Sequence, residues 1–152
     1  MPKAIVIYES VFGNTKRAAE AIIEGVKEAG VEATLSTPKE LDPNQLSDFD
    51  AIIIGSPNHM GGATRGIKKF IDKLGKLKLE GKLVAVFDTY AGGEYEKAVK
   101  KMEKQLGEKA PGLKIASPGL SIRVEGMRGP LSEGELPKGK EFGVIIANQL
   151  KG

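Results

Sequence analysis

Three strongly apolar runs constrain the fold of this chain more than any other feature. They are rich in β-branched residues and read KAIVIY (3–8), AIIIGS (51–56) and KLVAVFD (82–88). Segments in which apolar residues recur every three or four positions follow each run, over 14–29, 67–74 and 95–109. Apolar strands that alternate with amphipathic helices indicate parallel pairing, with helices on both faces of the sheet.

The remaining segments complete an α/β pattern. Residues 32–37 alternate like a half-buried edge strand, residues 114–124 contain a last strand kinked near Pro118, and residues 141–150 form the final helix. The segment 125–140 before that helix is expected to be a loop. Because right-handed crossovers leave few topologies, the sequence predicts one domain over residues 1–152, built on a five-stranded, doubly wound parallel sheet.

Composition excludes several classes of function. The chain has no cysteine, which rules out disulfides, iron–sulfur clusters and thiol catalysis, and its single histidine, His59, lacks partners for a metal site. A net charge of +3, from 23 basic and 20 acidic side chains, is typical of a solvated surface and not of a nucleic-acid-binding protein. No apolar run approaches the ~20 residues that span a bilayer, so a cytoplasmic location is the default expectation.

Three loops are expected at the carboxyl ends of the buried strands, where open parallel sheets bind their ligands. The first, ESVFGNT (9–15), offers hydroxyls, an amide and a glycine, and it opens onto a helix N-terminus that favours an anion. It contains no Lys or Arg, which suits a phosphate monoester, and the motifs GxxxxGK[ST] and GxGxxG are missing. The competing interpretation is a helix capped by Asn14.

The other two loops offer groups suited to a flat ligand. GSPNHMGG (55–62) has adjacent glycines, which allow close approach of the backbone, and the polarizable Met60. FDTYAGGEYE (87–96) holds Tyr90 and Tyr95, and an aromatic ring can stack on a ligand. Packing in the core is the alternative for Met60. For Tyr90 the ligand role is preferred, and for Tyr95 packing at the start of the next helix.

These loops resemble those of flavodoxins. IVIYESVFGNTKRAAEAI (5–22) is similar to the family's phosphate loop, FDAIIIGSPNHMGG (49–62) to the strand and loop on the inner flavin face, and GKLVAVFDTY (81–90) to the strand before the outer loop. The resemblance covers essentially the whole chain and is to the short-chain class. It implies a flavodoxin-like sheet of order 2-1-3-4-5 and non-covalent binding of FMN.

The resemblance also implies how the cofactor is held. The first loop would bind the 5′-phosphate, the other two would flank the isoalloxazine, and a peptide flip at Met60–Gly61 would stabilise the half-reduced ring. Asp88 would place a negative charge near the ring and lower its potential. No catalytic or metal-binding residue is implied. The implied cofactor-binding residues are Ser10, Phe12, Gly13, Asn14, Thr15, Ser56, Pro57, Asn58, His59, Met60, Gly61, Asp88, Thr89, Tyr90 and Gly93.

Three functions are compatible with these residues. The leading one is a carrier that shuttles low-potential electrons between redox partner proteins, as a monomer or weak homo-oligomer. The second is a flavodoxin-like NAD(P)H:quinone oxidoreductase, in which Arg65 would meet a nicotinamide phosphate, although such enzymes are usually longer. The third is a flavin-free binding module. Flavodoxins are typically acidic and often carry a stacking Trp, whereas this chain has no Trp and a pI of about 9.0, which puts the usual basic partners in doubt.

Overall fold

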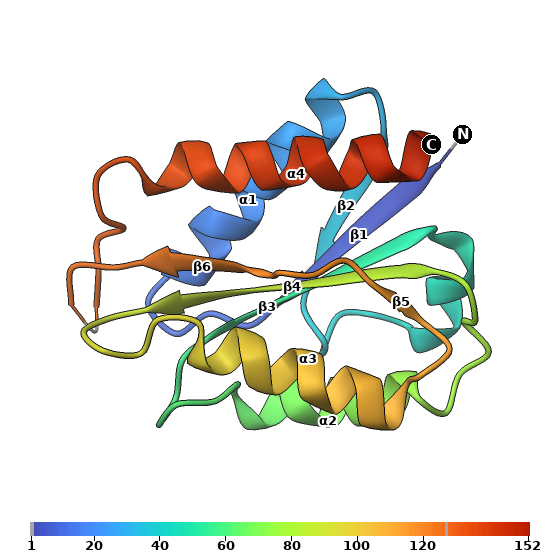
Figure 1. The fold of residues 1–152 in the computed structure, drawn as a ribbon, viewed down its shortest axis with the longest axis horizontal. Helices are drawn as coiled ribbons and strands as arrows, with labels where there is room; N and C mark the ends of the chain where they lie inside the picture. The colour runs from blue at the N-terminus through green and yellow to red at the C-terminus, as the bar shows by residue number, and fades with distance from the viewer. Residues whose placement is uncertain (1, 127) are drawn as a thin grey trace.

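Residues 2–126 and 128–152 are described by a computed structural model, in which a central sheet lies between two pairs of helices (Figure 1). All the strand pairs of the sheet are parallel, and the order β2-β1-β3-β4-β5 is the one predicted. The strands are β1 (Lys3–Tyr8), β2 (Glu32–Ser36), β3 (Ala51–Pro57), β4 (Leu83–Tyr90), β5 (Lys114–Ile115) and β6 (Leu120–Arg123).

The predicted last strand is divided into two pieces. β5 pairs with β4 at Leu83 and Val84, and β6 pairs with the other end of β4, from Phe87 to Tyr90. Pro118 lies between the two pieces, and a proline has no N–H to donate to a neighbouring strand. Both pieces pair with β4, so the sheet keeps the predicted order with a sixth strand attached.

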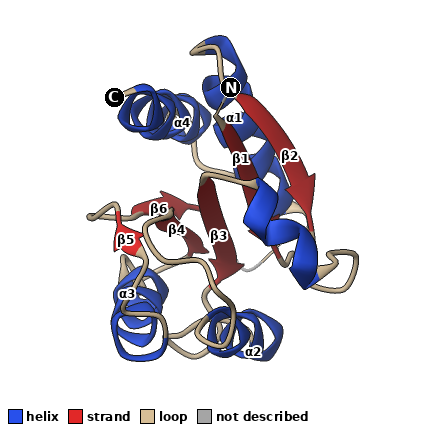
Figure 2. Cartoon of the chain, turned by 90° about the vertical axis from the view of Figure 1, so that its right-hand side faces the viewer, coloured by secondary structure: helices blue, strands red, loops and turns tan. Residues whose placement is uncertain are grey.

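Helices cover both faces of the sheet, with α1 and α4 on one side and α2 and α3 on the other (Figure 2). None of the helices within the described ranges is long and apolar enough to cross a membrane. The helices are α1 (Asn14–Glu28), α2 (Arg65–Leu74), α3 (Lys97–Lys109) and α4 (Glu135–Lys151), with a 3-10 turn, η1, at Pro43–Asp48.

Two hydrophobic cores result, one on each face of the sheet. Successive residues of a strand point to opposite faces. In β3, Ile52 and Ile54 therefore enter the core that includes Ile67 of α2, whereas Ile53 enters the core that includes Ile22 of α1. This burial on both faces explains why β1, β3 and β4 read as continuous apolar runs.

The final helix begins earlier than the sequence predicted. α4 starts at Glu135, within the segment expected to be a loop, of which position 127 lies outside the described residues. Pro137 falls in the first turn of α4, where the backbone N–H would have no acceptor within the helix, so proline does not interrupt it. Gly143 packs so closely on α1 that a Cβ there would collide with the carbonyl oxygen of Ile22.

Candidate functional site

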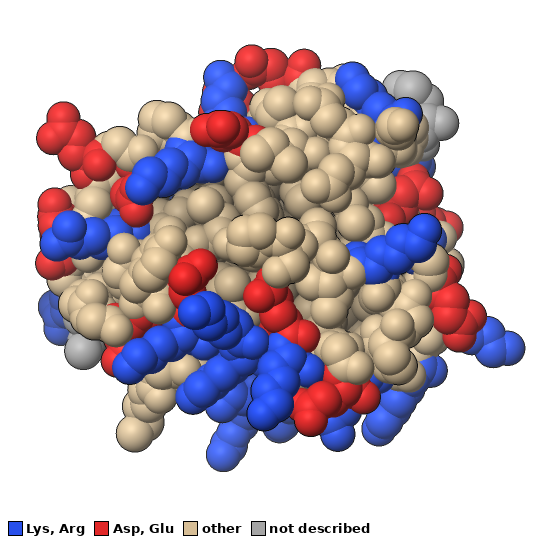
Figure 3. All heavy atoms as spheres, in the orientation of Figure 1, with Lys and Arg blue, Asp and Glu red and all other residues tan. Residues whose placement is uncertain are grey.

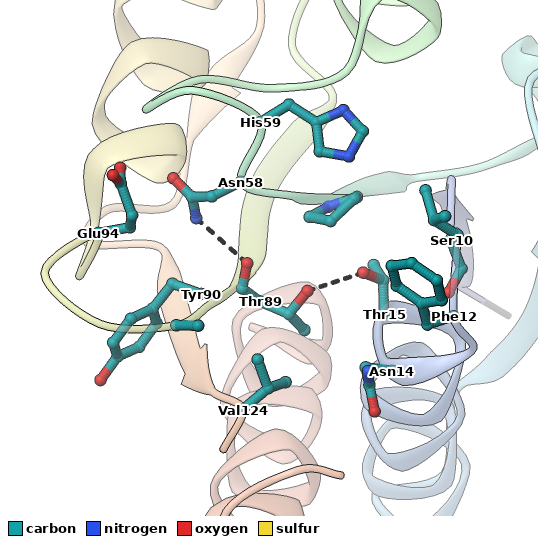
Figure 4. Close-up of a pocket in the computed structure, with 13 residues that line it drawn as sticks. Ser10, Phe12, Asn14, Thr15, Asn58, His59, Thr89, Tyr90, Glu94 and Val124 are labelled. Carbon is teal, nitrogen blue, oxygen red and sulfur yellow. Dashed lines mark hydrogen bonds between the residues drawn. The ribbon is translucent and has the colours of Figure 1, made fainter. Parts of the chain in front are cut away.

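A pocket of about 260 Å³ opens at the carboxyl ends of β1, β3 and β4 (Figure 4). Ser10 and Phe12 lie on one side of it and Tyr90 on the other, with Asn58 and His59 along a third wall. The three loops predicted to converge therefore do so. The lining residues are Ser10, Val11, Phe12, Asn14, Thr15, Pro57, Asn58, His59, Thr89, Tyr90, Ala91, Glu94 and Val124.

The loop before α1 forms a candidate anion seat. Gly13 is the N-cap, with a φ of 89° that favours glycine, so the interpretation that Asn14 caps the helix is wrong. Ser10 Oγ accepts hydrogen bonds from the N–H groups of Gly13 at 3.0 Å and Lys16 at 3.4 Å. The N–H groups of Asn14 and Thr15 have no acceptor among the described residues. They lie at the positive end of the helix dipole and can bind an anion.

The hydroxyls of Thr15 and Thr89 join the first and third loops. Their Oγ1 atoms are 2.8 Å apart, and both residues are buried. One hydroxyl hydrogen is enough for this bond, so the other is free to donate into the pocket. Together with the two N–H groups, this hydroxyl gives a set of neutral donors that fits the phosphate of a monoester.

Asn58 fixes the second loop to the third. Its backbone N–H and its Nδ2 both donate to the carbonyl oxygen of Thr89, at 2.9 and 3.2 Å. Its Oδ1 accepts a hydrogen bond from the N–H of Ala98 at the start of α3, at 3.0 Å. The side chain therefore joins two walls of the pocket and cannot turn freely.

Tyr90 lines the pocket, whereas Tyr95 packs against the ring of Tyr90 and does not line the pocket. The two rings meet edge to face, with centroids 5.4 Å apart and an interplanar angle of 68°. Burial, followed by the nearby carboxylate of Glu135, raises the pKa of Tyr90, so its hydroxyl stays protonated near neutral pH. The aromatic face of Tyr90 is thus held in place at the site.

The tip of the second loop is a strained turn. Met60 and Gly61 have φ of 54° and 79°, and His59 and Gly62 exchange two backbone hydrogen bonds, which defines a type I′ turn. A flip of the Met60–Gly61 peptide would convert this turn to type II′. The first central position of a type II′ turn favours glycine, and here Met60 occupies it. The flip expected from the family resemblance is therefore opposed by the side chain of Met60. That side chain is fully exposed, so its alternative placement in the core is wrong.

Six of the expected residues do not line the pocket. Asp88 is fully buried behind it, where its carboxylate accepts hydrogen bonds from Val99 N–H at 3.0 Å and the Ser121 hydroxyl at 2.6 Å. Burial raises the pKa of Asp88, although these two hydrogen bonds act in the opposite direction. The expectation that this carboxylate lies beside the ring does not match its position, because it points to α3. The others are Gly13, Ser56, Met60, Gly61 and Gly93.

Ser56 supports the site without lining it. Its Oγ accepts a hydrogen bond from Thr64 N–H at 3.0 Å and donates one to the carbonyl oxygen of Pro57 at 2.8 Å. Thr64 is the N-cap of α2, and its hydroxyl donates to the carboxylate of Glu9. Ser56 and Glu9 therefore hold the start of α2 against the ends of β1 and β3.

Four lining residues were not predicted. Val11, Ala91 and Glu94 lie inside the predicted loops, and their proximity to expected residues is the only sequence signal for them. Val124 follows β6 and had no such signal. The segment after it also packs on the anion seat, because Gly129 lies against Asn14 and the Arg128 guanidinium lies 5.6 Å from the ring centroid of Phe12.

The fold and this pocket define a class of protein: a doubly wound α/β protein with hydrogen-bond donors suited to an anion at its first helix, beside two loops suited to a flat ring. The match to known families is more specific. Residues 5–120 match the family model described as a flavodoxin domain. The chain belongs to the flavodoxin family, whose cofactor is a flavin.

Solved structures and curated relatives agree with this assignment. A flavodoxin from the domain Archaea has a TM-score of 0.85 at 29% identity and covers 99% of both chains. Oxidised flavodoxin 2 from Bacillus cereus has a TM-score of 0.81 at 27% identity, over 97% of this chain and 99% of that one. An Archaeoglobus fulgidus protein named NAD(P)H dehydrogenase (quinone) is 34% identical over 57% of this chain and 61% of its own. The chain thus spans less than two thirds of that relative.

Proposed function

We propose that this protein is an electron carrier, which binds FMN non-covalently in the pocket and passes low-potential electrons between redox partner proteins. The observation that carries this proposal is the size of the pocket. Its volume of about 260 Å³ lies just below the ~300–1,000 Å³ usual for ligand sites. A pocket of this size supports the binding of one flat ligand better than the binding of a flavin and a second substrate side by side.

The residues of the pocket fit FMN. The N–H groups of Asn14 and Thr15, with the free hydroxyl hydrogen of the Thr15–Thr89 pair, would hold the phosphate. Asn58 and Tyr90, each fixed by the contacts described above, would orient the ring and exclude water from it. A bound flavin supplies reversible uptake of one or two electrons.

The phosphate seat is tested by comparing FMN with riboflavin, which lacks the phosphate. We expect FMN to bind at least about 100-fold more tightly, since two charge-assisted hydrogen bonds are each worth about 1.5–3 kcal/mol. Thr15→Val should weaken FMN binding by about 10-fold and leave riboflavin binding nearly unchanged. Quenching of flavin fluorescence by the apoprotein measures both affinities.

The matched control is Thr34→Val, because Thr34 is exposed on the edge strand β2 and far from the pocket. It should change neither affinity. Equal binding of FMN and riboflavin would contradict the phosphate seat. A protein that binds no flavin at all would support a flavin-free binding module instead.

A second candidate function is NAD(P)H:quinone oxidoreduction. The name of the Archaeoglobus fulgidus relative favours it, as does Arg65, an exposed cation at the first position of α2 that can meet a nucleotide phosphate. Steady oxidation of NADH or NADPH by the FMN-loaded protein with a quinone would favour the enzyme. A carrier should show none.

A further inference from the structure

The charges of this chain are divided unevenly between its two sides. The stretch 65–109, which contains α2, β4 and α3, holds twelve basic and seven acidic residues, a net charge of +5. The remainder holds eleven basic and thirteen acidic residues, a net charge of −2, which together give the overall +3. Figure 3 shows Lys and Arg gathered on the lower side of the molecule, where Figure 1 places α2 and α3.

Three of these lysines, Lys68, Lys97 and Lys101, surround the turn at the tip of the second pocket loop; we call them the lysine cluster. A Cβ position built at Gly61 lies 3.5 Å from Glu94 Oε2, 3.7 Å from Lys97 Cδ and 3.8 Å from Lys101 Nζ. One built at Gly62 lies 3.6 Å from Lys101 Cδ and 3.8 Å from Lys68 Nζ. The three side chains come from two helices and converge on one loop.

The charge of this cluster is only partly neutralised. Lys97 lies 3.8 Å from the carboxylate of Glu94, whereas Lys68 and Lys101 have no carboxylate within 4.0 Å among the described residues. All three lysines are exposed. Like charges held this close repel one another, so an external anion gains energy by approaching them.

Met60 lies in the turn that the lysine cluster surrounds, directly before Gly61. Its side chain is fully exposed at the tip of the turn, and the preceding residue, His59, lines the pocket. A methionine side chain is polarizable and adapts to an irregular partner surface. An apolar centre with a polar rim is the usual composition of a protein–protein contact.

We propose that the lysine cluster and Met60 form the docking surface for an acidic redox protein, which exchanges electrons with the flavin of the pocket. This inference rests on the proposed carrier function. One electron leaves the metal centre of the partner, which is oxidised, and reduces the flavin by one electron; no bond forms or breaks. Complementary charge accelerates such encounters by about 10–10³-fold at low salt and repels partners of the same sign.

The probe is a reduced, acidic [2Fe–2S] ferredoxin mixed with the FMN-loaded chain in a stopped-flow instrument. Neutralising the cluster in the triple variant Lys68→Gln, Lys97→Gln, Lys101→Gln should lower the second-order rate constant by at least about 10-fold at low ionic strength. The wild-type rate constant should fall as salt is added, and that of the variant should fall much less.

The matched control is the triple variant Lys27→Gln, Lys76→Gln, Lys114→Gln. It removes the same number of positive charges, at the end of α1, after α2 and at the start of β5, away from the pocket. At an ionic strength of about 0.1 M it should change the rate constant by less than about two-fold, since the Debye length is then about 10 Å and more distant charges are largely screened. Equal effects of the two triple variants would overturn the assignment of the docking surface. So would a basic cytochrome c that reacts faster than ferredoxin at low salt.

Two further measurements separate this inference from the proposed function. Binding of oxidised ferredoxin to the flavin-free chain, by titration calorimetry, tests the docking surface even if FMN does not bind. The inference is supported if the triple variant of the lysine cluster binds ferredoxin more weakly than the wild type and the control variant does not. Tighter binding of duplex DNA than of ferredoxin, at equal salt and with the same dependence on the cluster, would overturn it.

Discussion

At the scale of single residues, Asp88 has the clearest consequence for stability. Its buried carboxylate accepts hydrogen bonds from Val99 and Ser121, and burial raises its pKa above the ordinary value. The folded protein therefore binds a proton more tightly than the unfolded chain. Stability from this group is fully present below the unfolded pKa and is lost as pH rises through the folded pKa.

Asp88→Asn keeps an acceptor for Val99 N–H and a group that can bond Ser121, but it cannot ionise. We expect the free energy of unfolding of the wild type to fall relative to this variant as pH rises from about 4 towards about 7. Urea denaturation across that range checks the trend, with the exposed Asp48→Asn as a control for loss of one carboxylate. A difference between wild type and Asp88→Asn that stays constant with pH would contradict it.

At the scale of elements, the crossing of α1 and α4 depends on glycine. A Cβ at Gly25 would collide with the carbonyl oxygen of Lys140, and one at Gly143 with that of Ile22. Read along the sequence, the Gly- and Pro-containing stretch before residue 141 is typical of a loop. The structure shows that Gly25 and Gly143, which lie outside this stretch, let the two helices approach closely, and this reason is not visible without the partner helix.

Two alanine substitutions distinguish a glycine that helix packing requires from one that it does not. Gly143→Ala should lower the free energy of unfolding by about 1–3 kcal/mol, because the added methyl group has no space. Gly107→Ala, in α3 with no atom within 4 Å of the added Cβ, should raise it by about 0.4–1 kcal/mol. Chemical denaturation measures both values. A Gly143→Ala variant as stable as the wild type, or more stable, would show that the crossing is not limited by space.

At the scale of the whole molecule, topology was readable from sequence and side-chain direction was not. The apolar runs of β1, β3 and β4 predict the parallel order, and parallel strands bring Ser10, Asn58 and Tyr90 to one edge. Val124 was missed because it depends on how the split last strand pairs with β4. The carboxylate of Asp88 was expected at the ring, but its hydrogen bonds to α3 and β6 determine where it points.

The uneven distribution of charge also belongs to this scale. From sequence alone, the pI of about 9.0 shows that the chain departs from the usual acidic character of flavodoxins, but not where on the surface the positive charge lies. In the folded chain the surplus positive charge lies on the side of α2 and α3, next to one wall of the pocket. Charge therefore bears on partner choice and association rate, and not on the fold itself.

The most direct test of the carrier function is an anaerobic reductive titration of the full chain loaded with FMN, followed by absorbance. A one-electron carrier should keep its flavin bound and take up the two electrons in separate steps, with a spectrum distinct from both end states at the midpoint. Uptake of both electrons in a single step, with no such spectrum, would contradict the carrier function and favour the quinone oxidoreductase.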